Sequence, residues 1–195
     1  MTILSRNDQK GRSMIEMLGV LAIIGVLSVG GISGYSKAMA KFKLTKAQDQ
    51  ISMLLMNIRT AFATSPSYDG LNTIAARDYN IAPGDMYGAA NSLNNAFGGK
   101  AYVYACNGIE DGGTCQGSAS GSPQYFAIRL TELGREACVS LASSDWGTDG
   151  LIGMIVNSTF SAAASLPLTP MVAGSGDKKH CGAKGEYNKI TWIYY

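Results

Sequence analysis

Few side chains in this sequence could perform acid–base, nucleophilic or metal chemistry. The chain of 195 residues contains one histidine, His180. A catalytic serine or cysteine would need that imidazole as its base. A zinc site needs several Cys or His ligands at compact spacing, whereas His180 stands beside Cys181 and no Cys-x2-Cys pair occurs. The sequence therefore predicts no metal site, no cofactor and no enzymatic activity.

The cysteines are better explained as disulfides. There are four of them: Cys106, Cys115, Cys138 and Cys181. Four cysteines allow three pairings, and spacing favours Cys106 with Cys115 across a short Gly-rich loop, and Cys138 with Cys181. On the chain-entropy account the longer loop contributes about 4 kcal/mol to stability. Because disulfides persist in oxidising compartments, we expect this part of the chain to be periplasmic or extracellular.

A carboxylate stands at the edge of a long apolar run. Residues 17–36 carry no charged side chain, and Glu16 directly precedes them. A helix of this length reaches roughly 30 Å, the thickness of a bilayer core. An acid at such a position costs about 2.5–3.5 kcal/mol at the bilayer centre and less at its edge. Glu16 is therefore either a functional residue with a partner, or an edge residue favoured by the helix macrodipole.

Charge divides the chain in two. Residues 1–63 carry eight basic and three acidic side chains, and residues 64–195 carry eight basic and eleven acidic ones. Such asymmetry is typical of a chain with one membrane-facing part. The overall net charge is only +2, which predicts no specific nucleic-acid binding.

Three simpler interpretations of the apolar run compete. It could be an ordinary anchor, or a signal peptide cut after Ala40, because Ala38-Met39-Ala40 has the small-x-small form, or merely a Gly-rich, loosely amphipathic stretch. The run exceeds the ~7–15-residue apolar core of signal peptides, which disfavours the second. A count of positive charges around the span would place the C-terminal part in the cytoplasm, whereas the cysteines place it outside. We therefore expect the C-terminal part to lie outside the cytoplasm, as the cysteines indicate.

The string from Gly11 to Leu18 resembles the processing site of type IV prepilins: a short basic leader ending in Gly, four residues, Glu, and an apolar run. The resemblance implies a leader of residues 1–11, cleavage by a prepilin peptidase between Gly11 and Arg12, and methylation of the new N-terminus. It also implies that Glu16 neutralises the N-terminal amine of a neighbouring subunit and sets the axial register of a filament. Most family members have Phe, Met or Leu where this chain has Arg12.

Helical spacing predicts a long first helix over residues 12–63. Its membrane or filament-core part is 14–36, and its amphipathic part is 37–63. The amphipathic part has an apolar stripe of Ala47, Ile51, Leu54, Leu55, Ile58, Ala61 and Phe62. The stripe is out of phase with the apolar residues before it, because Lys46 stands where an apolar residue is expected. An anchor followed by an independent helix is the alternative, and in either case the stripe must pack against the C-terminal part.

Residues 64–195 read as an α+β head. A turn-rich connecting loop occupies 64–100, with a short helix at 85–96. Strands are predicted at residues 101–106, 124–130, 151–157 and 189–195, and a helix capped by Thr131 at 131–142. We expect an antiparallel sheet with this helix against it, packed on the amphipathic half of the first helix.

The order of these elements resembles the type IVb pilins, with the conjugative thin-pilus and toxin-coregulated pilins as the nearest groups. The shared motifs are Pro83-x-Asp85-Met86, Asn95-x-Phe97-Gly98-Gly99 and Asn188-x-Ile190-Thr191-Trp192. The resemblance implies a ladle-like type IV pilin fold. It further implies that the disulfide-bounded segment 138–181 is variable and faces outward.

By this resemblance the chain is a structural pilus subunit. It would sit in the inner membrane with a periplasmic head, meet the pilus assembly machinery, and polymerise with its own copies into an extracellular pilus. The head would then contact a host surface or a recipient cell. A type II secretion pseudopilin or a minor pilin is the alternative. A membrane-anchored periplasmic enzyme, using His180 with serines and an acid such as Ser143-Ser144-Asp145, is a remote one.

Overall fold

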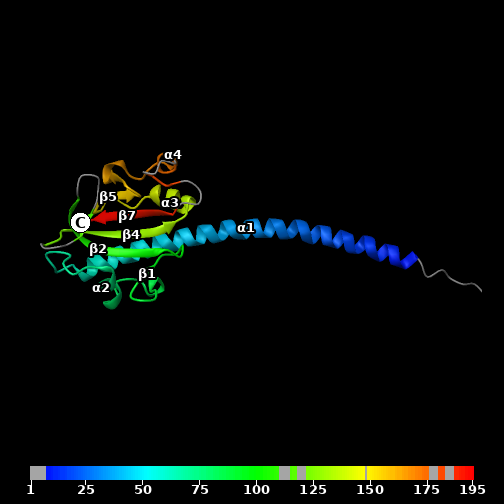
Figure 1. Ribbon diagram of the computed structural model, residues 1–195, viewed down its shortest axis with the longest axis horizontal. Coiled ribbons are helices and arrows are strands. Elements are labelled where there is room, and N and C mark those ends of the chain that lie inside the picture. The colour runs from blue at the N-terminus through cyan, green and yellow to red at the C-terminus, as the bar shows by residue number, and fades with distance from the viewer. Residues whose placement is uncertain (1–7, 110–114, 118–121, 148, 176–179, 183–186) are drawn as a thin grey trace, which may run out of the picture. The chain divides into compact units, whose positions relative to one another are not determined.

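The computed structural model describes residues 8–109, 115–117, 122–147, 149–175, 180–182 and 187–195 (Figure 1). The chain forms two compact units, Met1–Phe42 and Lys43–Tyr195. We describe each unit by itself. For residues 8–13, 108–109 and 115–117 the structure describes the backbone but not the side chains.

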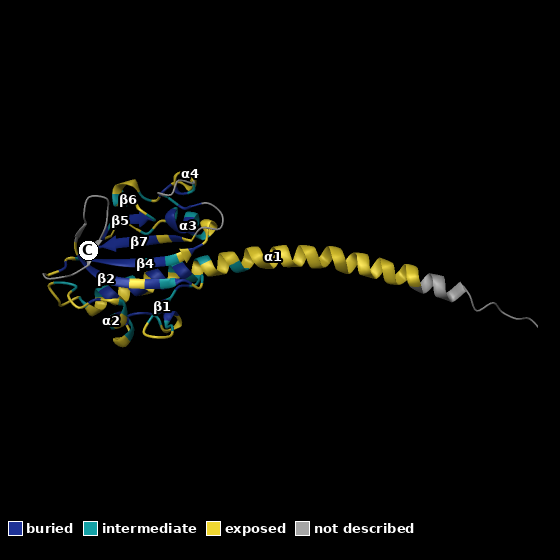
Figure 2. Cartoon of the chain, in the orientation of Figure 1, coloured by how far each residue is buried: buried dark blue, intermediate teal, exposed yellow. Residues whose placement is uncertain are grey.

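The described part of the first unit is the beginning of helix α1, which spans Asp8–Ala61. The helix continues because residues 8–61 contain no proline, and the first Pro is Pro66. Within the described residues, α1 is the one helix long and apolar enough to cross a membrane, and none of its apolar window is buried (Figure 2). The predicted long helix is confirmed as one continuous element, so an anchor followed by a separate helix is wrong.

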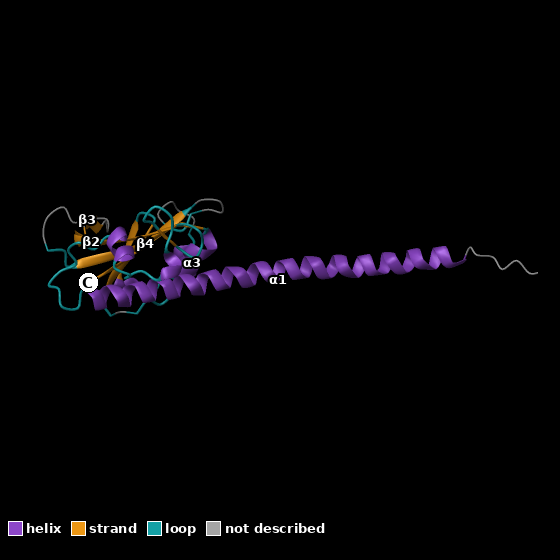
Figure 3. Ribbon diagram, turned by 90° about the horizontal axis from the view of Figure 1, so that it is seen from below, coloured by secondary structure: helices purple, strands orange, loops and turns teal. Residues whose placement is uncertain are grey.

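The second unit contains the last turns of α1, which pack under the sheet (Figure 3). Ala47, Ile51, Leu54 and Ile58 are at most 1% exposed and belong to the main core. Their spacing of three and four residues puts them on one helix face. This confirms the predicted stripe for its central members, whereas Ala61 at the end of the helix is exposed.

In the described residues the sheet has seven strands, and all pairs are antiparallel. The order is β1-β2-β4-β7-β5-β6, with β3 paired to β2. The strands are β1 Leu93–Asn94, β2 Lys100–Ile109, β3 Cys115–Gly117, β4 Tyr125–Leu133, β5 Leu151–Val156, β6 Thr159–Ala162 and β7 Asn188–Tyr194. All four predicted strands are present. The C-terminal strand β7 lies between β4 and β5, so residues far apart in sequence complete the centre of the sheet (Figure 1).

The two faces of the sheet differ. Along β7, Ile190, Trp192 and Tyr194 point into the main core, as the period of two in a strand requires. Helix α3, Arg135–Ala142, adds Cys138, Leu141 and Ala142 to the same core. The opposite face carries a smaller buried cluster of Cys106, Ala127, Ile155 and Ile193.

Two predicted helices are wrong in place or type. Residues 131–133 continue β4, and α3 begins at Arg135 after Gly134. Thr131 does not cap it, because its hydroxyl donates to the Lys100 carbonyl at 3.1 Å and accepts from the Lys100 N–H at 3.2 Å. The predicted helix at 85–96 is instead a 3-10 turn, Gly84–Met86, followed by β1.

Several short elements were not predicted. Helix α2 spans Thr73–Asp78 and starts at Asn72, whose side chain accepts hydrogen bonds from the N–H groups of Ile74 and Ala75. Strand β6, the 3-10 turn η2 at Ala163–Ser165 and helix α4 at Pro170–Ala173 lie in the disulfide-bounded segment. Elements of three to six residues carry too few periodic positions to stand out in a sequence.

Candidate assembly surface

The first part of α1 exposes an unusual quantity of apolar surface. Between Met14 and Tyr35 the large apolar side chains remain 52–76% exposed. They are Met14, Ile15, Met17, Leu18, Val20, Leu21, Ile23, Ile24, Val26, Leu27, Val29, Ile32 and Tyr35. Apolar area left in water is unfavourable by roughly 25 cal/mol per Å². This segment therefore needs lipid or other protein around it.

Five glycines interrupt this apolar segment, and packing inside one chain does not require them. A Cβ at Gly19, Gly25, Gly30, Gly31 or Gly34 would meet nothing within 4 Å. Each glycine costs the helix up to about 1 kcal/mol relative to Ala. They are consistent with close packing of helices from several copies, or with local unwinding during assembly.

The predicted processing and register residues lie at the start of α1. Gly11 and Arg12 are within the helix, and the Arg12 side chain is outside the described part of the chain. Glu16 is exposed and follows Arg12 by four residues, so both occupy one face about one turn apart. Cleavage after Gly11 and pairing of Glu16 with an N-terminal amine stay predictions.

A polar cluster attaches α1 to the connecting loop in the second unit. Lys46 Nζ lies 3.1 Å from Asp85 Oδ2, and Gln50 Nε2 donates to the same oxygen at 2.9 Å. Burial raises the pKa of Asp85, but these two hydrogen bonds and the ammonium charge outweigh it and hold the pKa below its ordinary value. Lys46 interrupts the apolar stripe because it binds this carboxylate.

The end of α1 is attached to the loop before β5. Arg59 Nη2 donates to the Asp149 carbonyl at 2.7 Å, and the guanidinium carbon lies 5.8 Å from the centre of the Tyr194 ring. Gly150 has φ +74°, a backbone conformation that favours glycine, and a Cβ there would require the Arg59 guanidinium to move. Together with the Asp85 cluster, this contact fixes the amphipathic half of α1 at two points.

The cysteine prediction is confirmed for one pair. Cys138 of α3 is bonded to Cys181, with 5.8 Å between their Cα atoms. Both side chains are fully buried, and the Cys181 N–H donates to Ala173 O at 3.0 Å. Cys106 is disulfide-bonded, whereas the Cys115 side chain is outside the described residues. The pairing of Cys106 with Cys115 stays a prediction.

The residues of the enzyme alternative do not converge on a reaction centre. His180 Nδ1 lies 3.4 Å from Ser175 Oγ, and within the described residues no carboxylate contacts the imidazole. Ser143 and Ser144 donate to carbonyl groups of their own helix, each at 2.7 Å. Across the described parts of the chain, no group of three or more His, Cys, Asp or Glu side chains could hold a metal ion.

Two asparagines from the type IVb motifs organise the head, a role that sequence reasoning did not assign. Asn95 Oδ1 accepts from the N–H groups of Phe97 at 2.9 Å and Gly99 at 3.1 Å, and its Nδ2 donates to Thr131 O at 2.8 Å. Asn188 is 1% exposed, accepts from Asn157 Nδ2 at 2.9 Å, and donates to Leu133 O at 3.1 Å. The sequence signal for this role is that both asparagines belong to the type IVb motifs and lie next to strands.

Comparison with known proteins identifies the family. The family model described as Bundlin matches residues 37–195. The major structural subunit of the bundle-forming pilus of Escherichia coli O127:H6 (strain E2348/69 / EPEC) is 26% identical over 203 residues, covering 98% of this chain and 97% of that protein. The subunit of the same description from Escherichia coli O111:H- has the same identity and coverage.

A solved structure supports the fold. The crystal structure of a type IV b pilin from Salmonella typhi aligns with a TM-score of 0.50 and 20% identity, covering 79% of this chain and 97% of that one. The long helix followed by an antiparallel sheet confirms the predicted α+β class. The chain therefore belongs to the Bundlin family, and its fold is that of a type IV pilin.

Proposed function

We propose that this chain is a structural subunit of a type IV pilus, and specifically its major subunit. The relatives described as major structural subunits of a bundle-forming pilus match it over nearly their whole length, which supports a major pilin over a minor pilin or a pseudopilin. The family is one of structural subunits, and an enzymatic role is not proposed.

One observation carries the proposal. The large apolar side chains of α1 from Met14 to Tyr35 are exposed, and within the described residues the second unit has a buried core of its own. A helix with this much exposed apolar surface needs a bilayer before assembly and other copies of itself afterwards. A homopolymeric filament satisfies that need away from the membrane.

The proposed assembly pathway follows from this transfer of the apolar helix from lipid to contacts with other copies. The subunit waits in the inner membrane with its disulfide-bonded head in the periplasm. Prepilin peptidase removes residues 1–11, and the assembly machinery adds the subunit to the pilus. The new amine at Arg12 is methylated and pairs with Glu16 of a neighbouring copy, because an unpaired charge in an apolar core is costly. In the finished extracellular pilus, segment 138–181 faces outward and contacts surfaces.

Replacing Glu16 tests the assembly step. We expect E16A and the isosteric, uncharged E16Q to be expressed and inserted in the membrane but to give few or no filaments in electron micrographs. S28A is the matched control, because Ser28 is an exposed polar residue of the same apolar segment and carries no charge. Abundant filaments from E16Q would remove the register role of this carboxylate.

Mass spectrometry of the mature protein tests the processing step separately. We expect the N-terminal peptide to begin at Arg12 and to carry the added mass of a methyl group. A mature chain that begins at Lys41 would show a signal peptide instead. An N-terminus at Met1 in assembled filaments would contradict cleavage altogether.

A further inference from the structure

A basic segment of α1 directly follows its apolar segment. The sequence contains no acidic residue between Glu16 and Asp49, and the charged residues of this interval are all lysines, at positions 37, 41, 43 and 46. Basic residues at this end of a membrane span are unusual when the part of the chain beyond the span lies outside the cytoplasm. The proposed function does not explain why they are there.

Two of these lysines, Lys37 and Lys41, belong to the first unit and lack a partner. Lys46 is bound to Asp85 in the second unit. Lys37 and Lys41 are exposed, and among the described residues neither side chain has a hydrogen-bond acceptor or a carboxylate beside it. Because they are four residues apart on one helix, their ammonium groups lie on the same face of α1.

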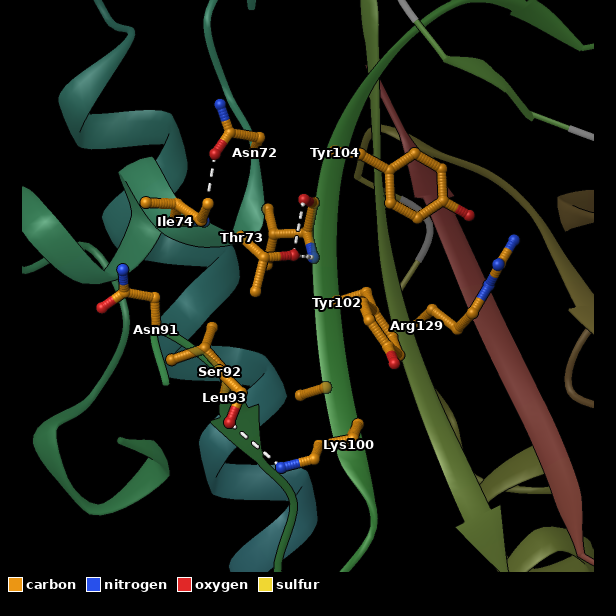
Figure 4. A pocket seen from close by; sticks show the side chains of 12 residues that line it. Asn72, Thr73, Ile74, Asn91, Ser92, Leu93, Lys100, Tyr102, Tyr104 and Arg129 are labelled. Carbon is orange, nitrogen blue, oxygen red and sulfur yellow. Dashed lines mark hydrogen bonds between the residues drawn. The ribbon is translucent and has the colours of Figure 1, made fainter. Parts of the chain in front are cut away.

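A lysine of the sheet shows the contrast. Lys100 Nζ donates to Ser92 Oγ at 3.0 Å (Figure 4) and to Asn94 Oδ1 at 2.9 Å. Contacts within the head therefore fix that ammonium group and replace part of its hydration. Lys37 and Lys41 have no such contacts in the described part of the chain, so their charges are available to a ligand from outside it.

The position of the two lysines along α1 matches the headgroup layer of a bilayer. The exposed apolar segment ends at Tyr35, which is 68% exposed and is of the residue type that is enriched at membrane–water interfaces. At about 1.5 Å per residue, Lys37 and Lys41 follow Tyr35 by about 3 Å and 9 Å. The headgroup layer on each side of the hydrocarbon is about 5–7 Å thick, and lysine side chains extend toward it. With α1 in a membrane, both ammonium groups reach the lipid phosphates.

We infer that Lys37 and Lys41 bind the phosphate groups of anionic lipids in the leaflet that faces the head. Ammonium groups form charge-assisted hydrogen bonds with phosphate, and each lysine near an anionic surface strengthens binding about fivefold. The contact holds α1 at one depth in the bilayer and gives the basic segment a role on this side of the span. The inference rests on the membrane stage of the proposed function, and it does not require filaments.

Competition between two lipids tests the inference. Full-length protein is reconstituted in phosphatidylcholine vesicles with a trace of spin-labelled phosphatidylglycerol or spin-labelled phosphatidylcholine. Electron paramagnetic resonance then measures the fraction of each label that the protein immobilises. The two labels have the same acyl chains and differ in headgroup charge. We expect phosphatidylglycerol to be preferred at least about threefold at about 0.1 M salt, and the preference to fall at about 1 M salt, where screening is stronger.

Variants locate the contact. K37Q/K41Q should lower the preference for phosphatidylglycerol at least about twofold, because the charges are removed while long polar side chains remain. K37R/K41R keeps both charges and should keep the preference. K189Q is the matched control, because Lys189 of β7 is also exposed and its side chain also lacks a partner among the described residues.

Several results would overturn the inference. They are insertion of the protein without a lipid preference, equal losses in K37Q/K41Q and K189Q, and loss of the whole preference when the basic residues that precede Glu16 are replaced by glutamine. Carbodiimide cross-linking of Lys37 or Lys41 to a carboxylate of another copy, in vesicles at low protein density, would assign these lysines to a protein partner instead.

The same measurements separate this inference from the proposed function. If the protein does not insert into vesicles, both the membrane stage of the proposed function and the lipid contact are contradicted. If it inserts without a lipid preference, only the lipid contact is contradicted. We expect E16Q, which should prevent filaments, to keep the preference for phosphatidylglycerol.

Discussion

Replacing Tyr194 with phenylalanine should remove part of the alkaline sensitivity of the head. Tyr194 lies near the end of the central strand β7, is fully buried, and stacks on Phe126 with 5.6 Å between ring centres. Burial raises its pKa to about 12, although the nearby Arg59 guanidinium lowers it in part. In the unfolded chain the phenol has its ordinary pKa of about 10.

The sign of the effect follows from proton binding. Above pH 10 the unfolded chain loses the phenolic proton while the native chain keeps it, so the unfolded state binds fewer protons and stability falls as pH rises. The contribution is fully present below pH 10 and is lost progressively toward pH 12. At pH 11 the loss amounts to about 1.4 kcal/mol, and the upper limit is about 2.7 kcal/mol.

Urea unfolding of the full chain in detergent, at pH 8 and at pH 11, measures this difference. Wild type should lose about 1.4 kcal/mol more than Y194F between the two pH values. Y79F is the control, because the Tyr79 ring is 77% exposed. The reasoning is refuted if Y194F and wild type lose the same stability, or if Y79F has the larger effect.

Three further changes test the packing of the head. Replacing Cys138 and Cys181 with serine should lower the free energy of unfolding by about 4 kcal/mol, measured by urea titration, because the unfolded chain regains a long open loop. L54A removes a fully buried side chain and should cost about 2–5 kcal/mol in the same assay. The Thr73 hydroxyl accepts a hydrogen bond from the Val103 N–H and donates one to the Val103 carbonyl. T73V removes both bonds, so it should lower the free energy of unfolding by about 1–3 kcal/mol and speed hydrogen exchange of the Val103 amide.

Matched variants accompany these three. M53A truncates a neighbour of Leu54 that is 55% exposed and should change stability little. T73S keeps the hydroxyl and should protect the Val103 amide as wild type does. If dithiothreitol leaves the unfolding midpoint unchanged, or if M53A costs as much as L54A, the assigned roles are incorrect.

The long helix and the main strands could be predicted because their signals are local. The apolar run after Glu16, the stripe from Ala47 to Ile58 and the absence of proline are all read within α1 itself. The strands show period-two or continuous apolar patterns within a few residues. The processing motif around Gly11 is likewise contiguous, and so the family resemblance was visible before any fold.

The start of α3 could not be read locally. Thr131 followed by acidic and apolar residues has the form of a helix start. In the head, β4 pairs with β7 as far as Leu133, with a register shift after Leu130, and Glu132 takes φ +58°. Hydrogen bonds to strands distant in sequence therefore overrode a locally favourable helix.

Sequence alone predicted the long apolar helix and the α+β head with a disulfide, because each depends on patterns that are read along the chain; the processing site at Gly11 stays a prediction from the same kind of local motif. Only the tertiary structure determined which groups the charged side chains contact. It paired Lys46 with Asp85, and it placed Arg59 against the Asp149 carbonyl. The physical reason is that electrostatic partners are chosen by strand pairing and helix packing across long sequence separations, which no local pattern records.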